Sequence, residues 1–486
     1  MSPLAPGAVR RVDAPLQGLL EQRDALADGQ VTSEGLVREA LARAERSRET
    51  LNAFWSLRKE EAILEAREAD SRLRDGDRLP LLGVPIAVKD DVDVAGLPTQ
   101  FGAAGTWPSR DEDAGVVRRR RAAGAIVIGK TTASEMGQWP VTANDVCGVT
   151  RNAWDLDFTP GGSSGGSGAA VAAGILAAAV GSDGAGSVRI PSAWSHLVGI
   201  KPQRGRISTW PHDDDWRGLS VIGPLARTVE DAALMLDVMT GAHASDRIQL
   251  DAPDQPFLEA ARRAPGRLRI GVSRSIAFNG MRRKVDPDVS AALDAMARTL
   301  RDLGHEVVDA NLRFGPQVGA SFMPRAMVGL EDWMRRAPDR KLVDPRIRSM
   351  ARMAHVLRGP ILAGTRRTER LLQRQVGRIF RRVDVVITPT TAVPPLPAEA
   401  LKGLRKWQTN SLITSACPYA WPWNVLGWPA VNVPGGFSEE NLPLGIQLLG
   451  PANSEALLIS LAAQLQQVRR WHEIWPDLAY ELAGGS

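Results

Sequence analysis

Short apolar runs alternate with helical segments through the first half of this 486-residue chain, and this alternation limits the folds that it can adopt. Two runs have the length and composition of buried strands, GVPIAVK (83–89) and AIVIGK (125–130). The segment between them contains VVRRRRAAG (116–124), which is expected to form a helix that ends at Gly124. A strand–helix–strand succession of this kind predicts an α/β fold.

The same alternation continues to the C-terminus. Further helices are predicted at 228–241, 289–304, 320–382 and 454–470, and further strands at 268–273, 384–389 and 442–450. The segment 390–430 is rich in proline and tryptophan and is expected to form loops. Because no repeat and no long linker divides the chain, we expect one domain over 1–486, with N-terminal helices (12–78), a core (80–210) and the remainder (211–486).

Composition argues against several kinds of partner. The net charge of +5 is a small excess for this length, and the basic run Arg118–Arg121 is expected to be a solvated helix face, so no nucleic-acid partner is predicted. The N-terminus lacks an apolar signal region, and the apolar stretch 169–180 is too short to span a bilayer. These features predict a cytoplasmic protein with no membrane partner.

Metal and cofactor sites are not expected either. Cys147 and Cys417 are the two cysteines, and no CxxC motif or Cys/His cluster accompanies them. The run from His212 to Asp215 is expected to be a solvated loop rather than a metal site. Two thiols in a chain of this length suit a reducing compartment.

Glycine and serine are concentrated in TPGGSSGGSGAAVAAG (159–174) and VGSDGAGSVRIPS (180–192). A flexible linker is disfavoured because the first segment leads directly into an apolar helix. A Walker phosphate loop is disfavoured because no Gly-Lys-Ser/Thr follows. The segment 161–165 fits the GxSxG elbow of α/β-hydrolases, but Pro160 is a poor end for the strand that such an elbow needs. Sequence alone excludes none of the histidines that this alternative requires.

A fourth interpretation accounts for more of the chain. Lys89 lies in GVPIAVKDDVDVAG, Ser163 is the first serine of GGSSGGS, and Ser187 lies in GSDGAGSVRIPS. These three motifs resemble the amidase signature family, and the flanking segments IGKTTASEMG, GIKPQRGRIS and PLGIQLLG agree with it. The lysine and nucleophile motifs look similar to those of the stand-alone amidases of actinobacteria, including the mycobacterial ones.

The resemblance implies a large mixed β-sheet surrounded by α-helices and an enzyme that works without a cofactor. The implied reaction cleaves the carbon–nitrogen bond of a carboxylic acid amide, giving a carboxylate and ammonia or an amine through an acyl-enzyme. Ser187 would be the nucleophile, Ser163 a proton relay with a cis peptide bond, and Lys89 the base. Met136, Gly137 and Trp139 would lie near the substrate channel. Whether esters or carbamates are also cleaved stays open.

The chemistry explains why such residues are needed. A serine hydroxyl is a weak nucleophile, so a base must take its proton during attack. A lysine can do this only as a neutral amine, which burial after an apolar strand favours. The alternative is a salt bridge from Lys89 to Asp90, Asp91 or Asp93, which would keep the amine charged. The backbone N–H groups of Gly184, Ala185 and Gly186 could stabilise the oxyanion, although the family usually has glycine at position 185.

Two other functions remain open at this point. One is a glutamine-dependent amidotransferase subunit, but such subunits have SIRQP after the nucleophile, where this chain has SVRIP (187–191). The other is an inactive binding protein, which the presence of all three catalytic side chains argues against. A small-molecule amide is the expected partner, and a homodimer is left open.

Overall fold

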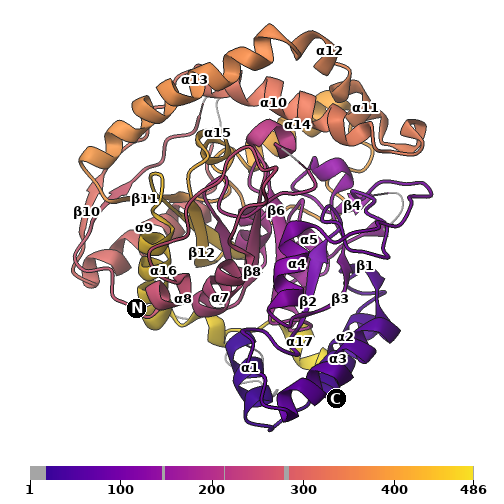
Figure 1. Ribbon diagram of the computed structural model, residues 1–486. Coiled ribbons are helices and arrows are strands. Elements are labelled where there is room, and N and C mark those ends of the chain that lie inside the picture. The colour runs from indigo at the N-terminus through magenta and orange to yellow at the C-terminus, as the bar shows by residue number, and fades with distance from the viewer. Residues whose placement is uncertain (1–17, 145–147, 213, 278–283, 485–486) are drawn as a thin grey trace.

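The computed structural model describes residues 18–144, 148–212, 214–277 and 284–484 of the chain (Figure 1). Cys147 and Asp213 therefore lie outside the described residues. Within the described part, eleven strands form one mixed sheet in the order β1-β3-β2-β6-β8-β7-β12-β13-β11-β9-β10. Its strands are β1 (Phe54–Leu57), β2 (Pro85–Lys89), β3 (Ile126–Thr131), β6 (Ala178–Asp183), β7 (Val198–Lys201), β8 (Val221–Ala226), β9 (Arg269–Val272), β10 (Glu306–Asp309), β11 (Val385–Pro389), β12 (Ala430–Phe437) and β13 (Pro443–Leu449). The short strands β4 (Ala143–Asn144) and β5 (Gly148–Val149) pair separately.

Helices surround this sheet (Figure 1). The α-helices are α1 (Leu19–Ala27), α2 (Ser33–Arg46), α3 (Lys59–Arg74), α4 (Gly115–Ala122), α5 (Gly165–Ala172), α6 (Arg189–Trp194), α7 (Val229–Met239), α8 (Phe257–Ala261), α9 (Pro287–Asp302), α10 (Gln317–Met334), α11 (Pro345–Ala351), α12 (Ala354–Leu357), α13 (Pro360–Gly377), α14 (Lys406–Ala416), α15 (Pro422–Leu426), α16 (Glu455–Arg469) and α17 (Asp477–Leu482). Short 3₁₀ helices are η1 (Glu135–Gly137), η2 (Asp215–Gly218), η3 (Arg340–Leu342), η4 (Arg378–Arg381) and η5 (Trp471–Glu473). In the described part of the chain, no helix is both long and apolar enough to cross a membrane.

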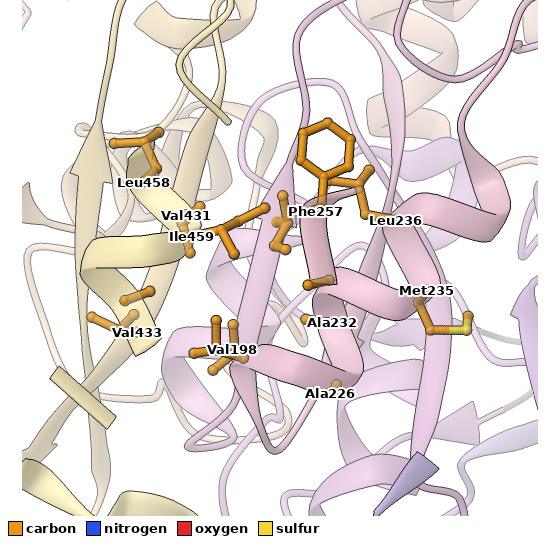
Figure 2. Close-up of a cluster of buried hydrophobic side chains, with 14 of the residues drawn as sticks. Val198, Ala226, Ala232, Met235, Leu236, Phe257, Val431, Val433, Leu458 and Ile459 are labelled. Carbon is orange, nitrogen blue, oxygen red and sulfur yellow. The ribbon is translucent and has the colours of Figure 1, made fainter. Parts of the chain in front are cut away.

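The two faces of the sheet are buried in different core clusters. Figure 2 shows apolar side chains of α7, α8 and α16 packed together with those of β7, β8 and β12. Beside β2 and β3 the other face is covered by α5, which packs with α2 and α3. Alternate residues of β2 divide between the two clusters, because successive side chains of a strand point to opposite faces: Ile86 and Val88 join the first and Ala87 the second. The same period places Lys89 on the face of Ala87, toward α5.

The predicted α/β fold with a large mixed sheet is confirmed, and three local expectations are wrong. The segment 12–78 contains the strand β1 as well as helices, and the segment 390–430 contains α14 and α15. The basic run is not wholly solvated, because Arg120 of α4 is fully buried. Burial lowers the pKa of this guanidinium to about 9.

Candidate active site

Two neighbouring parallel strands bring the polar residues of the site to one edge of the sheet. Strand β2 pairs in parallel with β6, with Val88 opposite Val180. Lys89 ends β2, and Ser182 and Asp183 end β6, so all three side chains lie where these strands finish. This edge is where ligands commonly bind to α/β sheets.

Lys89 is buried and has three oxygen partners. Its Nζ atom lies 2.7 Å from Ser163 Oγ and 2.7 Å from Ser182 Oγ. The same atom lies 2.9 Å from Asp91 Oδ2, and the Ser182 hydroxyl donates a hydrogen bond to that carboxylate. The serine contact and the salt bridge, which the sequence presented as alternatives, therefore occur together.

Ser163 stands in a tight glycine turn that leads into α5. The Gly162–Ser163 peptide bond is cis, and the Ser163 side chain is buried. A Cβ atom at Gly162 would lie only 2.4 Å from the carbonyl oxygen of Trp139, so a larger residue would not fit there. This close packing holds the Ser163 hydroxyl against Lys89.

Ser187 lies in the loop between β6 and α6, beside the glycine turn. Its carbonyl oxygen accepts a hydrogen bond of 3.3 Å from the Ser164 N–H. Between described residues, no hydrogen bond joins the Ser187 hydroxyl to Ser163 or to any other side chain. The structure thus brings Lys89 and Ser163 into contact and places Ser187 on the adjoining segment without a bond to its hydroxyl.

A buried ion pair shapes the loop that carries Ser187. The Asp183 carboxylate accepts hydrogen bonds from Arg189 Nε (2.9 Å) and Nη2 (3.0 Å) and from the backbone N–H groups of Gly186 (2.8 Å) and Val188 (3.3 Å). Asn424 donates to the same carboxylate at 2.8 Å. Burial alone would raise the pKa of Asp183, but the Arg189 charge and these donors hold it well below its usual range.

The loop 184–187 supplies backbone donors, but Gly186, one of the three expected, is not among them. The Gly186 N–H already donates to Asp183, so in this conformation it does not face a ligand. The N–H groups of Gly184, Ala185 and Ser187 have no acceptor among the described residues. Gly186 has a φ of 122°, and a Cβ atom there would lie 2.7 Å from Ala420 Cβ, so this turn requires glycine.

The three residues expected near the substrate channel divide between the core and the site. Met136 and Trp139 are buried in an apolar cluster, where the Arg346 guanidinium lies 4.5 Å from the centroid of the Trp139 ring. Gly137 lies beside Ser163, because a Cβ atom at this position would lie 3.7 Å from Ser163 Oγ. The same Cβ atom would lie 3.1 Å from the ring of Trp333.

Two tryptophans that the sequence analysis did not single out border the site. Trp333 of α10 and Trp216 of η2 meet edge to face, with ring centroids 5.4 Å apart. A Cβ atom at Gly184 would lie 3.9 Å from Trp216, so this ring faces the nucleophile loop. No local sequence signal identifies them, since fourteen tryptophans occur in the chain.

The segment around His212 is partly buried, which corrects the expected solvated loop. His212 and Asp215 line a small cavity that also touches Asp91, Asp93 and Ser182. Burial lowers the pKa of His212 to about 4 and raises that of Asp215 to about 6. Asp215 accepts a hydrogen bond of 2.8 Å from Trp333 Nε1.

Among the described residues, no group of three or more His, Cys, Asp or Glu could hold a metal ion.

Several known proteins are similar to this chain over most of its length. A family model described as "Amidase" matches residues 35–459. The chain is 52% identical over 453 residues to "Putative amidase AmiA2" of Mycobacterium tuberculosis, covering 93% of both chains. It is 43% identical over 469 residues to "Putative amidase AmiB2" of the same organism, over 96% of this chain and 99% of that one. It also superposes on 6-aminohexanoate cyclic dimer hydrolase with a TM-score of 0.86 and 30% identity, over 95% of this chain and 99% of that one.

Proposed function

The chain belongs to the amidase family of amide-hydrolysing enzymes, and we propose that it cleaves a carboxylic acid amide through an acyl-enzyme on Ser187. The observation that carries the proposal is the buried contact of 2.7 Å between Lys89 Nζ and Ser163 Oγ, directly beside the segment that holds Ser187. A base and a hydroxyl in contact next to a second hydroxyl form the arrangement that nucleophilic serine catalysis needs.

In the proposed reaction, Ser187 Oγ attacks the amide carbon while its proton passes to Ser163. Ser163 gives its own proton to the neutral amine of Lys89, so the proton reaches the base without a histidine. The N–H groups of Gly184, Ala185 and Ser187 would stabilise the oxyanion that forms on the carbonyl oxygen. The proton then returns along the same path to the leaving amine, and water hydrolyses the acyl-enzyme to the carboxylate.

The surroundings of the site favour an apolar acyl group. Trp216 and Trp333 form an aromatic wall beside the nucleophile loop, and Ala185 packs against the same apolar cluster. Burying an apolar group against such a wall contributes about 25 cal/mol for each Å² removed from water. We therefore propose a linear amide with an aliphatic or aromatic acyl group as the substrate class.

The two other functions are disfavoured. A protein that supplies ammonia from glutamine would need polar groups around the acyl part of its substrate, whereas the rings of Trp216 and Trp333 pack beside the nucleophile loop of this chain. An inactive protein would have no need of a buried lysine against a serine hydroxyl, because burying such polar groups costs free energy.

The test is a hydrolysis screen over amides that vary separately in acyl and amine part, with wild type and Ser187→Ala compared. Wild type is expected to release amine and carboxylate from apolar acyl amides, and Ser187→Ala is expected to lose nearly all of this activity. Glutamine is included as the matched polar amide. Preferred hydrolysis of glutamine would favour the amidotransferase, and equal rates for the two proteins would remove Ser187 from the mechanism.

A further inference from the structure

We propose that Asp91, acting with Ser182, is a positioning residue that sets the direction of the hydrogen bonds around Lys89 and turns its lone pair toward Ser163. The inference rests on the proposed function, because it describes how the base of that reaction is prepared. The Asp91 carboxylate is buried, contacts both Lys89 and Ser182, and is not one of the three catalytic side chains.

The donors and acceptors of Lys89, Asp91 and Ser182 determine the direction of each hydrogen bond between them. An ionised carboxylate accepts hydrogen bonds and donates none, so both the Lys89 amine and the Ser182 hydroxyl must donate to Asp91. Since the single proton of Ser182 is used in this way, its oxygen can only accept from Lys89, which lies 2.7 Å away. A neutral amine has two N–H groups and one lone pair. Both N–H groups are therefore directed to Asp91 and Ser182.

The remaining contact of Lys89 is the one with Ser163. As an ammonium ion, Lys89 donates to Ser163 Oγ across the distance of 2.7 Å. In its neutral state both N–H groups are engaged, so the lone pair at this contact accepts the Ser163 proton. Ser163 is then a donor to Lys89 and keeps its oxygen lone pairs for a proton from Ser187. The carboxylate thus prepares the direction of proton transfer before substrate binds, as a carboxylate does when it fixes the tautomer of a catalytic histidine.

Asp91 also balances the charge that the reaction creates. During attack, the Ser187 O–H bond breaks, a bond forms between Ser187 Oγ and the carbonyl carbon, Ser163 exchanges one proton for another, and an N–H bond forms on Lys89. The amine becomes an ammonium ion, and the carboxylate 2.9 Å away stabilises that ion in a buried setting. The oxyanion carries the opposite charge, so the net charge of the site is unchanged.

Other charged groups near Lys89 have partners of their own. Asp90 pairs with Lys130 at 3.0 Å, Asp93 pairs with Arg110 at 3.2 Å, and His212 and Asp215 lie across the small cavity. At the end of β6, Asp183 is neutralised by Arg189. The second carboxylate oxygen of Asp91 is buried without a hydrogen-bond partner among the described residues, so the charge of this group is directed to Lys89 and Ser182.

The test uses the full chain and a fluorophosphonate probe that labels activated serines. The labelling rate of Ser187 is measured between about pH 6 and pH 10, because a lysine-like ionisation falls in this range. Asp91→Asn keeps the shape but removes the charge, and it replaces one of the two acceptor oxygens by an N–H₂ group that only donates. We expect labelling to fall by about 10²-fold or more at high pH, in the range for lost general-base assistance. The midpoint of the rising limb should also move to lower pH by about one unit or more, because an opposite charge near the amine is gone.

Three further variants separate positioning from folding. Asp93→Asn removes a carboxylate from the same segment that pairs with Arg110 instead of Lys89, and it should leave both rate and midpoint near those of wild type. Ser182→Ala should lower the rate while the midpoint stays in place, because the carboxylate remains. Ser182→Thr retains the hydroxyl and should restore most of the rate. Thermal melts check that each variant is folded.

The outcomes distinguish this inference from the proposed function. If wild type labels on Ser187 while folded Asp91→Asn keeps its rate and its midpoint, the role of Asp91 is refuted and the proposed function stands. A lower labelling rate with an unchanged pH midpoint would show that Asp91 has only a structural role. Should Asp91→Asn fail to fold, a full rate for Ser182→Ala would refute the hydrogen-bond arrangement. Absence of labelling in wild type would overturn the proposed function and this inference together.

Discussion

Replacing Asp183 by asparagine should both destabilise the protein and slow the nucleophile. Asp183 is buried and accepts hydrogen bonds from the Arg189 guanidinium, from two backbone N–H groups of the loop 186–188 and from Asn424. Asparagine keeps the size of the side chain but removes its charge and replaces one acceptor by a donor. Arg189 is then left charged, fully buried and without its counter-ion.

The size of the effect follows from these contacts. Breaking a buried ion pair by removing one partner costs about 3–5 kcal/mol, because the remaining charge is uncompensated. The Gly186 N–H also loses its acceptor at 2.8 Å, so the loop that carries Ser187 is expected to shift. A displacement of about 1 Å at a reacting group can cost about 10²-fold in rate. We therefore expect a loss of about 3–5 kcal/mol in unfolding free energy and slower labelling of Ser187.

The assay is urea unfolding followed by tryptophan fluorescence, with recovery on dilution checked for each protein. Asp157→Asn is the matched control, because Asp157 is exposed and its substitution should change the unfolding free energy by less than about 0.5 kcal/mol. Labelling of Ser187 by a fluorophosphonate is measured on the same preparations. A loss below about 1 kcal/mol together with an unchanged labelling rate would refute the role assigned to the Asp183–Arg189 pair.

Three further outcomes are expected. Ser163→Ala and Lys89→Ala should each reduce amide hydrolysis by about 10²-fold or more. The double variant should be little worse than the poorer single variant, because both substitutions interrupt the same proton path. Additive losses in kinetic assays would contradict this expectation. Gly137→Ala should fold but lose up to about 10²-fold in activity, since its φ of 65° disfavours alanine and the methyl group would crowd Trp333 beside Ser163. Full activity would contradict the position assigned to Gly137. Burial lowers the pKa of Lys201 to about 7, so between this pH and about pH 10.5 the folded state binds fewer protons than the unfolded state. The unfolding free energy of wild type relative to Lys201→Met should therefore rise from about pH 7 to pH 9 in urea melts. A difference that stays constant over this range would refute the lowered pKa.

Much of the site could be predicted because its residues lie in short, characteristic segments. The apolar run that ends at Lys89 predicted a buried strand, and the two glycine-rich segments marked the turns at Ser163 and Ser187. A strand, a glycine turn and a helix are determined mainly by nearby residues. For this reason the α/β fold followed from the sequence, whereas the contact between Lys89 and Ser163, which are 74 residues apart, was expected only from the resemblance to the family.

Other features depend on packing between distant segments. Three carboxylates follow Lys89 closely, and only the three-dimensional structure shows that Asp91 is its partner while Asp90 turns to Lys130 and Asp93 to Arg110. The wall formed by Trp216 and Trp333 joins η2 to α10, and nothing near either residue indicates the contact.

Two errors have a similar cause. Four consecutive arginines span more than one turn of a helix, so one of them, Arg120, must point inward although the run reads as solvated. The strand β1 is only four residues long and is followed directly by the helix α3, and its pairing with β3 decides its conformation. In both cases tertiary contacts override the local composition.

The central claim is that Ser187 is the residue acylated during amide cleavage. Full-length protein is incubated with a fluorophosphonate, digested and analysed by mass spectrometry, with Ser163→Ala as a folded comparison. One adduct is expected on the peptide that contains Ser187, and a much slower adduct at the same residue in Ser163→Ala. An adduct on Ser163 in the wild-type protein would contradict the role proposed for Ser187 and favour a hydrolase elbow at 161–165.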